Sequence, residues 1–412
     1  MAPAAIQTQD VNLTAAAVDR KDAAVTKPNV TGTVTEVEIP LEASRLVVNR
    51  SKNLRVVPTE DEANAGSETI CTDHMITCNW KAGAGWEAPE LKPYGPFSIM
   101  PTASVLHYAT ECFEGLKVYR GYDGKLRVFR PDRNCARMRL SAGRISLPVF
   151  EASELEKLML DLLAIDGPRW LPKDRAGSFL YIRPTLIGTQ SQLGVQAPKE
   201  AMLYIIVSFM PRLDAPPGGM KLHTSPEDMV RAWVGGFGYA KVGANYGPSL
   251  MATQDARRRG YHQILWLYGE NQECTEAGAS NFFLLWERKD GKKELITAPL
   301  DDKLILDGVT RRSCLDYARE NLDDVVITER KYGIAEVMEA ASEGRILEAF
   351  SSGTAYFVCA VSKIHHRGQD VDIPMGEDGK MGPYTAKIKN GLKDIMYGNV
   401  QHPWGVVVQE EQ

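Results

Sequence analysis

A run rich in proline and glycine, "PRLDAPPGGMK" (211–221), interrupts the chain near its middle, and no helix or strand is expected to continue through it. Patterned segments lie on both sides. Alternating or continuous apolar runs predict strands, and apolar residues at helical spacing predict helices. Strands are predicted at 125–130, 178–188, 202–209, 262–269, 281–288 and 355–361, and helices at 152–166, 310–322 and 334–344.

Both halves therefore mix the two kinds of element, which predicts an α/β (α+β) protein. A chain of 412 residues is long for a single core, so two domains are expected. The predicted parts are a flexible N-terminal tail (1–45), an N-terminal α/β domain (46–210), an interdomain linker (211–221) and a C-terminal domain (222–412). The regular alternation of a doubly wound sheet is missing, and we find no internal repeat.

Composition excludes several classes of function. The net charge of −5 and the lack of a long basic run argue against a nucleic-acid partner. The longest apolar stretch, 202–210, is too short to cross a bilayer. The seven cysteines are scattered without a C-x-x-C pair, which indicates reduced thiols, and neither they nor the seven histidines have zinc spacing, so no metal is expected.

The first 30 residues decide the expected location. They contain one arginine, and their acidic residues offset their basic ones, unlike a mitochondrial presequence. A secretory apolar core is also missing. A cytoplasmic location is therefore favoured, with a mitochondrial one left as the alternative.

One lysine stands in an unusual setting, "AKVGANYGPS" (240–249). Gly243, Asn245 and Gly247 surround Lys241 with residues that permit tight turns or close approach. An ordinary surface lysine needs no such surroundings. The segment lacks the G-K-[ST] ending of a phosphate-binding P-loop, and no G-x-G-x-x-G opens a helix elsewhere. Lys241 is therefore either an ordinary surface lysine or an amine that the surrounding backbone holds against a ligand.

Pyridoxal phosphate chemistry makes definite demands on the residues around such an amine. The pyridine nitrogen needs an acid or base partner, the phosphate needs donors and positive charge, and the phenolic oxygen needs a donor. Glu276 and Tyr246 are candidates for two of these roles. The turns at Gly308–Thr310 and at Thr354 offer backbone N–H groups. Each feature alone is only a turn or a helix cap, so the signal lies in their combination.

At these positions the chain resembles a known family. "VGGFGYAKVGANYGPS", "CTEAGASN", "LDGVTRRS" and "SSGTA" look like the signature blocks of class IV aminotransferases, the fold-type-IV pyridoxal phosphate enzymes. In the N-terminal half, "CTDHM", "HYATECFEGLKVYRG", "FRPDRNCARMRLSAGR" and "YIRPTLIGTQSQLGVQ" are similar to eukaryotic branched-chain amino acid aminotransferases. The resemblance implies a smaller N-terminal domain, a larger C-terminal domain and the cofactor at their interface.

The resemblance also implies roles for individual residues. Lys241 matches the Schiff-base lysine, Tyr246 the donor to the phenolic oxygen, and Glu276 the partner of the pyridine N–H. Arg137 matches a bidentate phosphate ligand, which an arginine fork suits better than a lysine. The remaining implied phosphate contacts are the backbone at Val309 and Thr310 and the side chain of Thr354.

The implied substrate site is drawn from both halves of the chain. Its residues are Tyr108, Phe113, Tyr181, Arg183, Val195 and Ala355. Phe113 and Tyr181 match apolar walls, whereas Tyr108, Arg183 and the Thr354–Ala355 turn match the surroundings of the substrate carboxylate. Leu193 and Val195 match a loop that closes the pocket of a partner subunit, so a homodimer is implied.

Several positions depart from the family pattern. Ser67 stands where an aromatic pocket residue is usual, and Tyr356 replaces the first cysteine of a C-x-x-C, leaving Cys359 alone. Other departures near the site are Tyr239, Ala240, Ala279 and Ser280. The expected function is transamination between branched-chain L-amino acids (leucine, isoleucine, valine) and 2-oxoglutarate. The alternatives are a class IV enzyme for larger aliphatic or aromatic amino acids and a catalytically inactive homologue.

Overall fold

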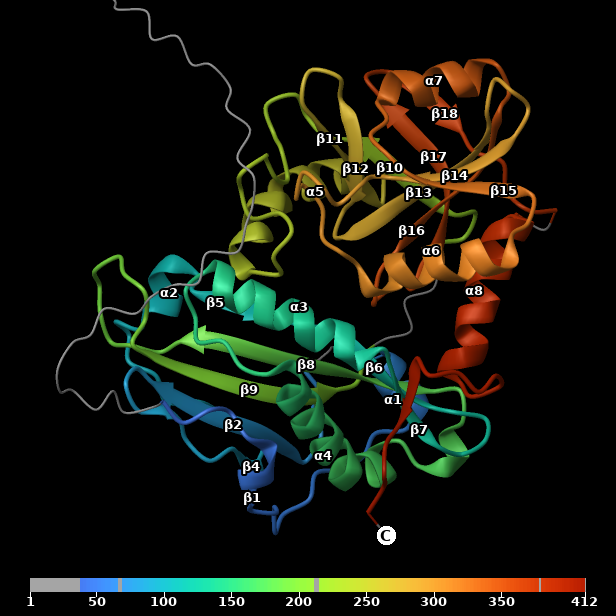
Figure 1. Cartoon of the computed structure of the whole chain (residues 1–412). Helices are drawn as coiled ribbons and strands as arrows, with labels where there is room; N and C mark the ends of the chain where they lie inside the picture. Colours follow the sequence, from blue (N-terminus) through green and yellow to red (C-terminus); the bar gives the residue numbers. More distant parts are fainter. Residues whose placement is uncertain (1–37, 66–68, 211–214, 378, 412) are drawn as a thin grey trace, which may run out of the picture. The chain divides into compact units, whose positions relative to one another are not determined.

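The computed structural model describes residues 38–65, 69–210, 215–377 and 379–411, and these form one compact unit (Figure 1). The predicted tail lies almost wholly outside the described residues, as do four residues of the linker. The helices are α1 (Glu60–Ala65), α2 (Ser104–Tyr108), α3 (Pro131–Arg144), α4 (Ala152–Trp170), α5 (Leu250–Arg258), α6 (Val309–Asn321), α7 (Ile334–Ser342) and α8 (Pro383–Met396).

A mixed, mainly antiparallel sheet is built from the first part of the chain and its C-terminal strand. The main strands, in spatial order, are β1 (Val47–Val48), β4 (Glu90–Pro93), β2 (His74–Lys81), β9 (Glu200–Ser208), β8 (Phe179–Gly188), β6 (Leu116–Arg120), β7 (Leu126–Phe129) and β19 (Gly405–Val407). Two short strands, β3 (Gly85–Trp86) and β5 (Glu111–Phe113), pair with β2 and β8.

The second sheet is built from the strands that lie between β9 and β19 in the sequence. Its main strands, in spatial order, are β12 (Glu273–Ala277), β11 (Gln263–Tyr268), β10 (Met220–Thr224), β17 (Val358–His366), β16 (Ile346–Ser352), β13 (Ser280–Glu287), β14 (Lys293–Thr297) and β15 (Val325–Glu329). Strand β18 (Gln369–Asp372) pairs with β17. An additional pairing of β12 with β13 closes six of the strands into a ring.

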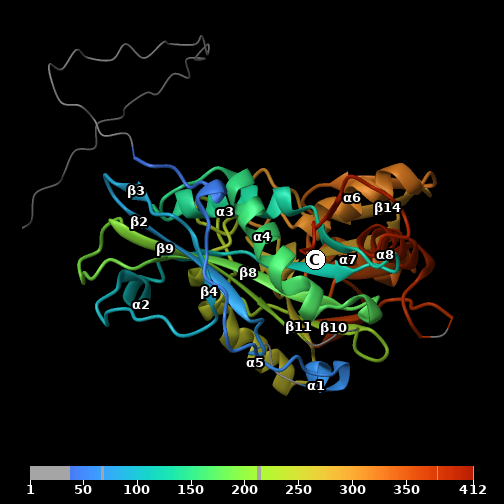
Figure 2. The same ribbon diagram turned by 90° about the horizontal axis from the view of Figure 1, so that it is seen from below.

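Helices α3 and α4 pack together on one face of the first sheet (Figure 2). In α4 the buried apolar side chains are those of Leu155, Leu158, Met159, Leu162, Leu163 and Trp170. Their spacing places them on one helical stripe, which faces the sheet. The helix predicted at 152–166 is confirmed and extends four residues further, to Trp170.

A separate core joins the second sheet to α6 and α8. It includes Phe283 and Phe350, whose rings stack 4.7 Å apart, together with Tyr119 and Phe129 from the first sheet. Both sheets thus contribute to one apolar cluster. The prediction of an α/β fold is confirmed, but the exact domain boundaries stay a prediction.

The predicted strand at 355–361 is wrong at its beginning. Strand β17 begins at Val358, and residues 353–357 form a turn instead. Phe357 takes a positive φ of 59°, a conformation that an extended strand does not contain. This turn carries Thr354 and Ala355, so the difference concerns the candidate site.

A buried ion pair ties the C-terminal residues to the first sheet. The Arg120 side chain is fully buried and donates to both carboxylate oxygens of Glu410, at 2.6 and 2.9 Å. Its Nε donates to the Leu171 carbonyl oxygen at 2.7 Å. The arginine is therefore held on two of its edges.

Replacing Glu410 by glutamine should destabilise the protein, because the buried arginine then loses one charged acceptor. We expect the free energy of unfolding to fall by about 1–3 kcal/mol. Urea denaturation of Glu410→Gln and the wild type measures this difference. An unchanged midpoint would show that the pair contributes nothing to stability.

Candidate active site

The backbone around Lys241 is fixed to two other elements. The Lys241 N–H donates to Ser141 Oγ on α3 at 2.8 Å, and the Lys241 carbonyl oxygen accepts from the Phe113 N–H at the end of β5 at 3.1 Å. Asn245 adds a local clamp, since its amide donates to the carbonyl oxygens of Phe237 and Ala240. These bonds hold the start of the side chain in place.

The amine of Lys241 lies against two aromatic rings. Nζ donates to the Tyr246 hydroxyl at 3.1 Å and lies 4.8 Å from the centre of the Phe113 ring. The rings of Phe113 and Tyr246 are themselves 5.2 Å apart. A Cβ at Gly243 would come within 2.0 Å of Glu111 Oε1, so the backbone approaches the neighbouring strand closely there. Both lysine and tyrosine are therefore placed together, as predicted.

Glu276 is a buried carboxylate on β12, with 2% of its surface exposed. Its Oε1 accepts from the Leu306 N–H at 2.9 Å and from the Asn281 amide at 3.3 Å. Arg231 Nε lies 2.5 Å from Oε2 as an ion pair. Even so, no donor among the described residues reaches Oε2 in hydrogen-bonding geometry. One buried carboxylate oxygen is thus left to accept a further N–H.

Burial raises the pKa of Glu276 above its ordinary value, while Arg231 and the Leu306 N–H act in the opposite direction. A carboxylate in this setting gains from a proton-bearing partner at Oε2. Such a partner would offset the cost of keeping the charge away from water.

Arg137 is placed by a second buried carboxylate, Glu114. Its Nε and Nη2 donate to the two Glu114 oxygens at 2.7 and 2.8 Å, and its Nη1 donates to the Asp307 carbonyl oxygen at 2.8 Å. These bonds use three of the five N–H donors of a guanidinium. The Nε–Nη2 edge of the Arg137 guanidinium therefore binds a carboxylate of the protein, and two N–H donors remain for a phosphate.

A helix start and a turn lie beside this arginine. Helix α6 begins at Val309, after Gly308, so the N–H groups of Val309 and Thr310 have no acceptor within the helix. A Cβ at Gly308 would come within 2.1 Å of Asn281 Oδ1. The Thr310 hydroxyl donates to the Gly353 carbonyl oxygen at 3.2 Å, which ties the helix start to the turn of Thr354. The arrangement suits an anion at the helix N-terminus.

The turn at Thr354 is tied in turn to the first sheet. The Thr354 hydroxyl donates to the Gly115 carbonyl oxygen at 3.1 Å, and Lys117 Nζ donates to the Ala355 carbonyl oxygen at 3.1 Å. A cavity of about 410 Å³ lies on the far side of this turn, between Lys117 and α8. Its lining includes neither Lys241 nor Glu276, so we do not assign it to the cofactor.

Three of the predicted substrate residues form one cluster. Arg183 Nη2 donates to the Tyr181 hydroxyl at 2.9 Å, and the guanidinium lies 4.7 Å from the Phe113 ring centre. Arg183 Nε is buried and has no hydrogen-bond acceptor among the described residues. Because Phe113 also touches Lys241, this cluster adjoins the amine. The unpaired N–H is suited to an anionic substrate group.

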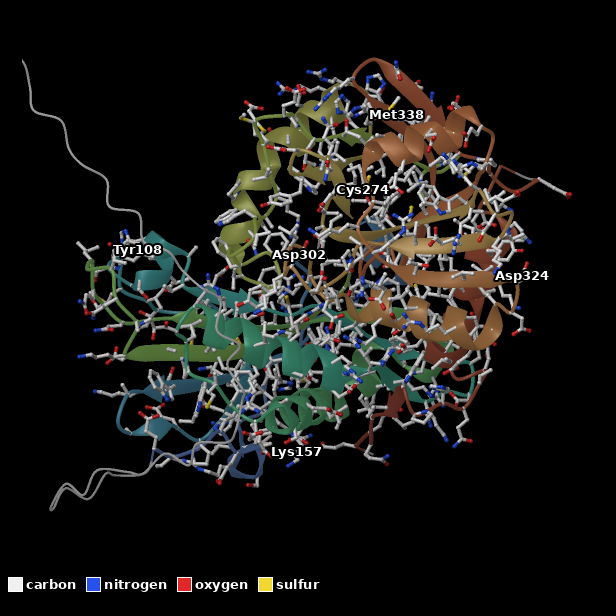
Figure 3. All side chains as sticks on the ribbon, turned by 45° about the horizontal axis from the view of Figure 1, so that its top comes forward. Tyr108, Lys157, Cys274, Asp302, Asp324 and Met338 are labelled. Carbon is white, nitrogen blue, oxygen red and sulfur yellow. The ribbon has the colours of Figure 1, made fainter. Side chains whose placement is uncertain are left out.

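Two further predicted substrate residues, Tyr108 and Val195, lie at the surface, whereas Ala355 is half-buried in the Thr354 turn. The Tyr108 hydroxyl donates to the Leu193 carbonyl oxygen, and Figure 3 shows Tyr108 at the end of α2, well away from the second sheet. Tyr108 is 39% exposed, Leu193 57% and Val195 84%. These residues lie on α2 and in the connection between β8 and β9, where their side chains are exposed rather than packed around Lys241.

Sequence reasoning missed four residues that hold the predicted ones. They are Glu114, Ser141, Arg231 and Asn281. Glu114 stands in the quoted "FEG" stretch, and its position beside a glycine was the only available signal. Arg231 lies ten residues before Lys241 with no local pattern that marks it. Long-range side-chain contacts of this kind leave no periodic trace in a sequence.

The departures from the family pattern have mixed outcomes. Ser67 lies outside the described residues, so its effect on the pocket stays a prediction. Ser280 lies beside the turn of Thr354, since a Cβ at Gly353 would come within 2.8 Å of the Ser280 hydroxyl. Tyr356 lines the cavity beside Lys117, whose lining does not include Lys241.

Comparison with known proteins agrees with this geometry. The family model for amino-transferase class IV matches residues 111–364, a span that contains Lys241, Glu276 and Arg137. Fold and site together thus define a class IV aminotransferase. Among similar proteins is the "Branched-chain-amino-acid aminotransferase, mitochondrial" of Schizosaccharomyces pombe, 43% identical, with 89% of this chain and 86% of that protein covered. The "Branched-chain-amino-acid aminotransferase, cytosolic" of Mus musculus is also 43% identical, with 90% and 94% covered. The chain belongs to the branched-chain-amino-acid aminotransferase family.

Solved structures show the same fold. The branched-chain aminotransferase of Escherichia coli matches with a TM-score of 0.58 and 25% identity, covering 81% of this chain and 99% of that one. The enzyme of Thermoproteus uzoniensis, solved with norvaline, matches with a TM-score of 0.62 and 24% identity, covering 80% and 99%. The predicted family is confirmed. Among the described residues, no helix is long and apolar enough to cross a membrane.

An alanine at Gly308 should disturb the site, because its Cβ would press on the buried Asn281, which bonds Glu276. Overpacking of this kind costs about 1–3 kcal/mol of unfolding free energy. Gly247→Ala is the matched control, since a Cβ there meets nothing within 4 Å. Chemical denaturation should separate the two variants. Equal stability of both would contradict the close approach at Gly308.

Proposed function

We propose that the protein transfers amino groups between branched-chain L-amino acids and 2-oxoglutarate, giving branched 2-oxo acids and L-glutamate, with pyridoxal phosphate as cofactor. The observation that carries the proposal is the arrangement of Lys241, Tyr246 and Glu276. The demands of this cofactor are met by an amine held against a tyrosine hydroxyl and by a buried carboxylate. One oxygen of that carboxylate pairs with Arg231 but accepts no hydrogen bond from the described residues. The names of the family relatives support the substrate class.

The residues present fit the cofactor at each of its polar groups. Glu276 Oε2 offers an acceptor for the pyridine N–H, and the start of α6 offers N–H donors to the phosphate. Arg137 adds positive charge beside Asp307, just ahead of that helix. Gly308 lets the start of α6 approach Asn281, which bonds Glu276. Lys241 is the amine that would hold the cofactor covalently.

When bound, pyridoxal phosphate supplies an electron sink for the carbanion formed at the substrate Cα. The protein supplies the proton transfer and the orientation. Lys241 Nζ would move the proton between the substrate Cα and the cofactor carbon, acting as general base and then as general acid. Tyr246, 3.1 Å from Nζ, orients the amine through its hydroxyl. Glu276 would accept the N–H of the cofactor ring, and this interaction would favour the protonated ring that acts as the electron sink.

Arg183 and the Thr354–Ala355 turn are proposed to bind the substrate carboxylates. The buried, unpaired Nε of Arg183 favours an anion there. Phe113 and Tyr181 supply apolar walls beside the guanidinium, with their ring centres 4.7 and 5.1 Å from Arg183 Cζ. A branched aliphatic side chain suits such surroundings.

We further propose a homodimer in the cytoplasm. Tyr108, Leu193 and Val195 present an exposed edge that a partner subunit would cover, and each would then complete the partner's pocket. Family relatives carry both mitochondrial and cytosolic names, so location rests on the N-terminal composition. Two domains, 46–210 and 222–412, are supported by the two sheets, because most strands of each sheet lie on opposite sides of the linker in the sequence. The exception is β19 (Gly405–Val407), which joins the first sheet.

Two alternatives remain distinct from this proposal. A class IV enzyme for larger aliphatic or aromatic amino acids would share the lysine site but not the preference for leucine. A catalytically inactive homologue would not need its full set of site residues. Lys241, Tyr246, Glu276 and Arg137 are all present. Lys241 bonds Tyr246, and Glu276 and Arg137 bond the consecutive residues Leu306 and Asp307, which argues against inactivity.

Borohydride reduction of the cofactor-loaded protein should fix the cofactor on Lys241, because the neighbouring backbone and the Tyr246 hydroxyl hold that amine. Peptide mass spectrometry locates the modified residue. Lys241→Ala serves as the control and should take up no label. A label on any other lysine would overturn the assignment.

Leucine, isoleucine and valine should convert the cofactor from its pyridoxal to its pyridoxamine form faster than phenylalanine does. We expect a ratio of kcat/KM values of roughly 10–200-fold, the range set by differences in apolar fit. Visible absorbance of the purified protein follows the conversion with each amino acid. A preference for phenylalanine would favour the altered-range alternative, and no conversion with any amino acid would favour an inactive homologue.

A further inference from the structure

Three consecutive residues join β5 to β6 and touch three different parts of the candidate site. The Phe113 N–H donates to the Lys241 carbonyl oxygen at 3.1 Å. Glu114 pairs with Arg137, and the Gly115 carbonyl oxygen accepts from the Thr354 hydroxyl at 3.1 Å. The segment therefore links the lysine, the arginine and the turn that the proposed function assigns to one cofactor.

Glu114 is the charged member of this segment and is fully buried. Besides the two bonds from Arg137, its Oε2 accepts from the Asn134 amide at 2.7 Å. Burial alone would raise the pKa of Glu114, but Arg137, with help from Lys241 and Asn134, holds that pKa below its ordinary value. The carboxylate is thus ionised, and its hydrogen bonds aim it at the arginine.

A buried guanidinium without a counter-charge is costly, and its long side chain has several rotamers. Glu114 supplies the counter-charge and, through its two hydrogen bonds, restricts the rotamers of Arg137 without the help of a ligand. By occupying Nε and one N–H of Nη2, it fixes the plane of the guanidinium and leaves the other N–H groups to face elsewhere. A preorganised donor loses less entropy when its ligand binds.

We propose that Glu114 is a positioning residue for cofactor binding, which acts by holding Arg137 in the orientation that receives the phosphate. This inference rests on the proposed function, in which the cofactor is pyridoxal phosphate. It differs from a purely structural role, in which Glu114 would stabilise the fold and leave cofactor affinity unchanged.

The geometry of the segment leaves little freedom for a substitute. A Cβ at Gly115 would come within 1.9 Å of the Tyr181 hydroxyl, so the chain cannot shift towards β8. A glutamine at position 114 keeps the size of the side chain but presents an NH₂ group to one of the arginine donors. Arg137 would then lose one acceptor and its counter-charge, and its orientation would no longer be unique.

The test is a titration of the cofactor-free protein with pyridoxal phosphate, followed by absorbance and fluorescence. We expect Glu114→Gln to raise the Kd roughly tenfold or more, the scale of one charged hydrogen bond lost. Arg137→Lys should also weaken binding. In the double variant the two effects should not add, because Glu114 acts through Arg137. Additive effects, an unchanged Kd or tighter binding in Glu114→Gln would each overturn the proposal.

Glu410→Gln is the matched control, since Glu410 also accepts two hydrogen bonds from a buried arginine but touches no residue of the candidate site. It should lower stability and leave the Kd for the cofactor within about twofold, well below the scale of one hydrogen bond. If Glu410→Gln weakened cofactor binding as much as Glu114→Gln, general destabilisation would explain both, and the proposal would fail.

A second variant keeps the test decisive if Glu114→Gln does not fold. Asn134→Ala leaves the ion pair but removes the amide that holds Glu114 Oε2. We expect a Kd raised by about threefold to tenfold, the scale of a neutral hydrogen bond, and an unchanged Kd would overturn the proposal. A wild-type protein that does not bind pyridoxal phosphate would instead refute the proposed function itself.

Discussion

The site depends on two buried carboxylate–arginine pairs placed on either side of Lys241. Glu276 lies 2.5 Å from Arg231, and Glu114 holds Arg137 by two hydrogen bonds. Buried charges of this kind persist only when they are paired. Each pair still has hydrogen-bonding capacity for a ligand. Glu276 Oε2 accepts no hydrogen bond from the described residues, and Arg137 has two further N–H groups. The charges that pair within the site are therefore also those that would bind the ligand.

The two sheets have separate tasks in this arrangement. The first supplies Phe113, Glu114 and Arg183 from β5, β8 and the connection to β6, while the closed ring of the second supplies Glu276 on β12. Lys241 belongs to the segment between β10 and α5 and is bonded to α3 and β5. No single element contains the site, so its geometry depends on the packing between both parts of the chain.

Much of the fold was readable from local patterns. Helices α4 and α6 and strands β11 and β13 lie where apolar spacing predicts them, because each buries one stripe or a continuous apolar run. The β12–β13 closure and the turn before β17 were not readable, since pairing partners and a positive φ at Phe357 depend on tertiary contacts. Motifs gave the lysine and Glu276, but Glu114 and Arg231 contact partners 23 and 45 residues away, beyond any local pattern.

The central claim is that the pairs around Lys241 form a ready-made receptor for pyridoxal phosphate. A crystal structure of the cofactor-loaded protein tests it most directly. The account predicts electron density continuous from Lys241 Nζ to the cofactor, with the ring nitrogen bonded to Glu276 Oε2 and the phosphate at the start of α6 beside Arg137. A cofactor joined to another residue, or a ring nitrogen without contact to Glu276, would contradict it.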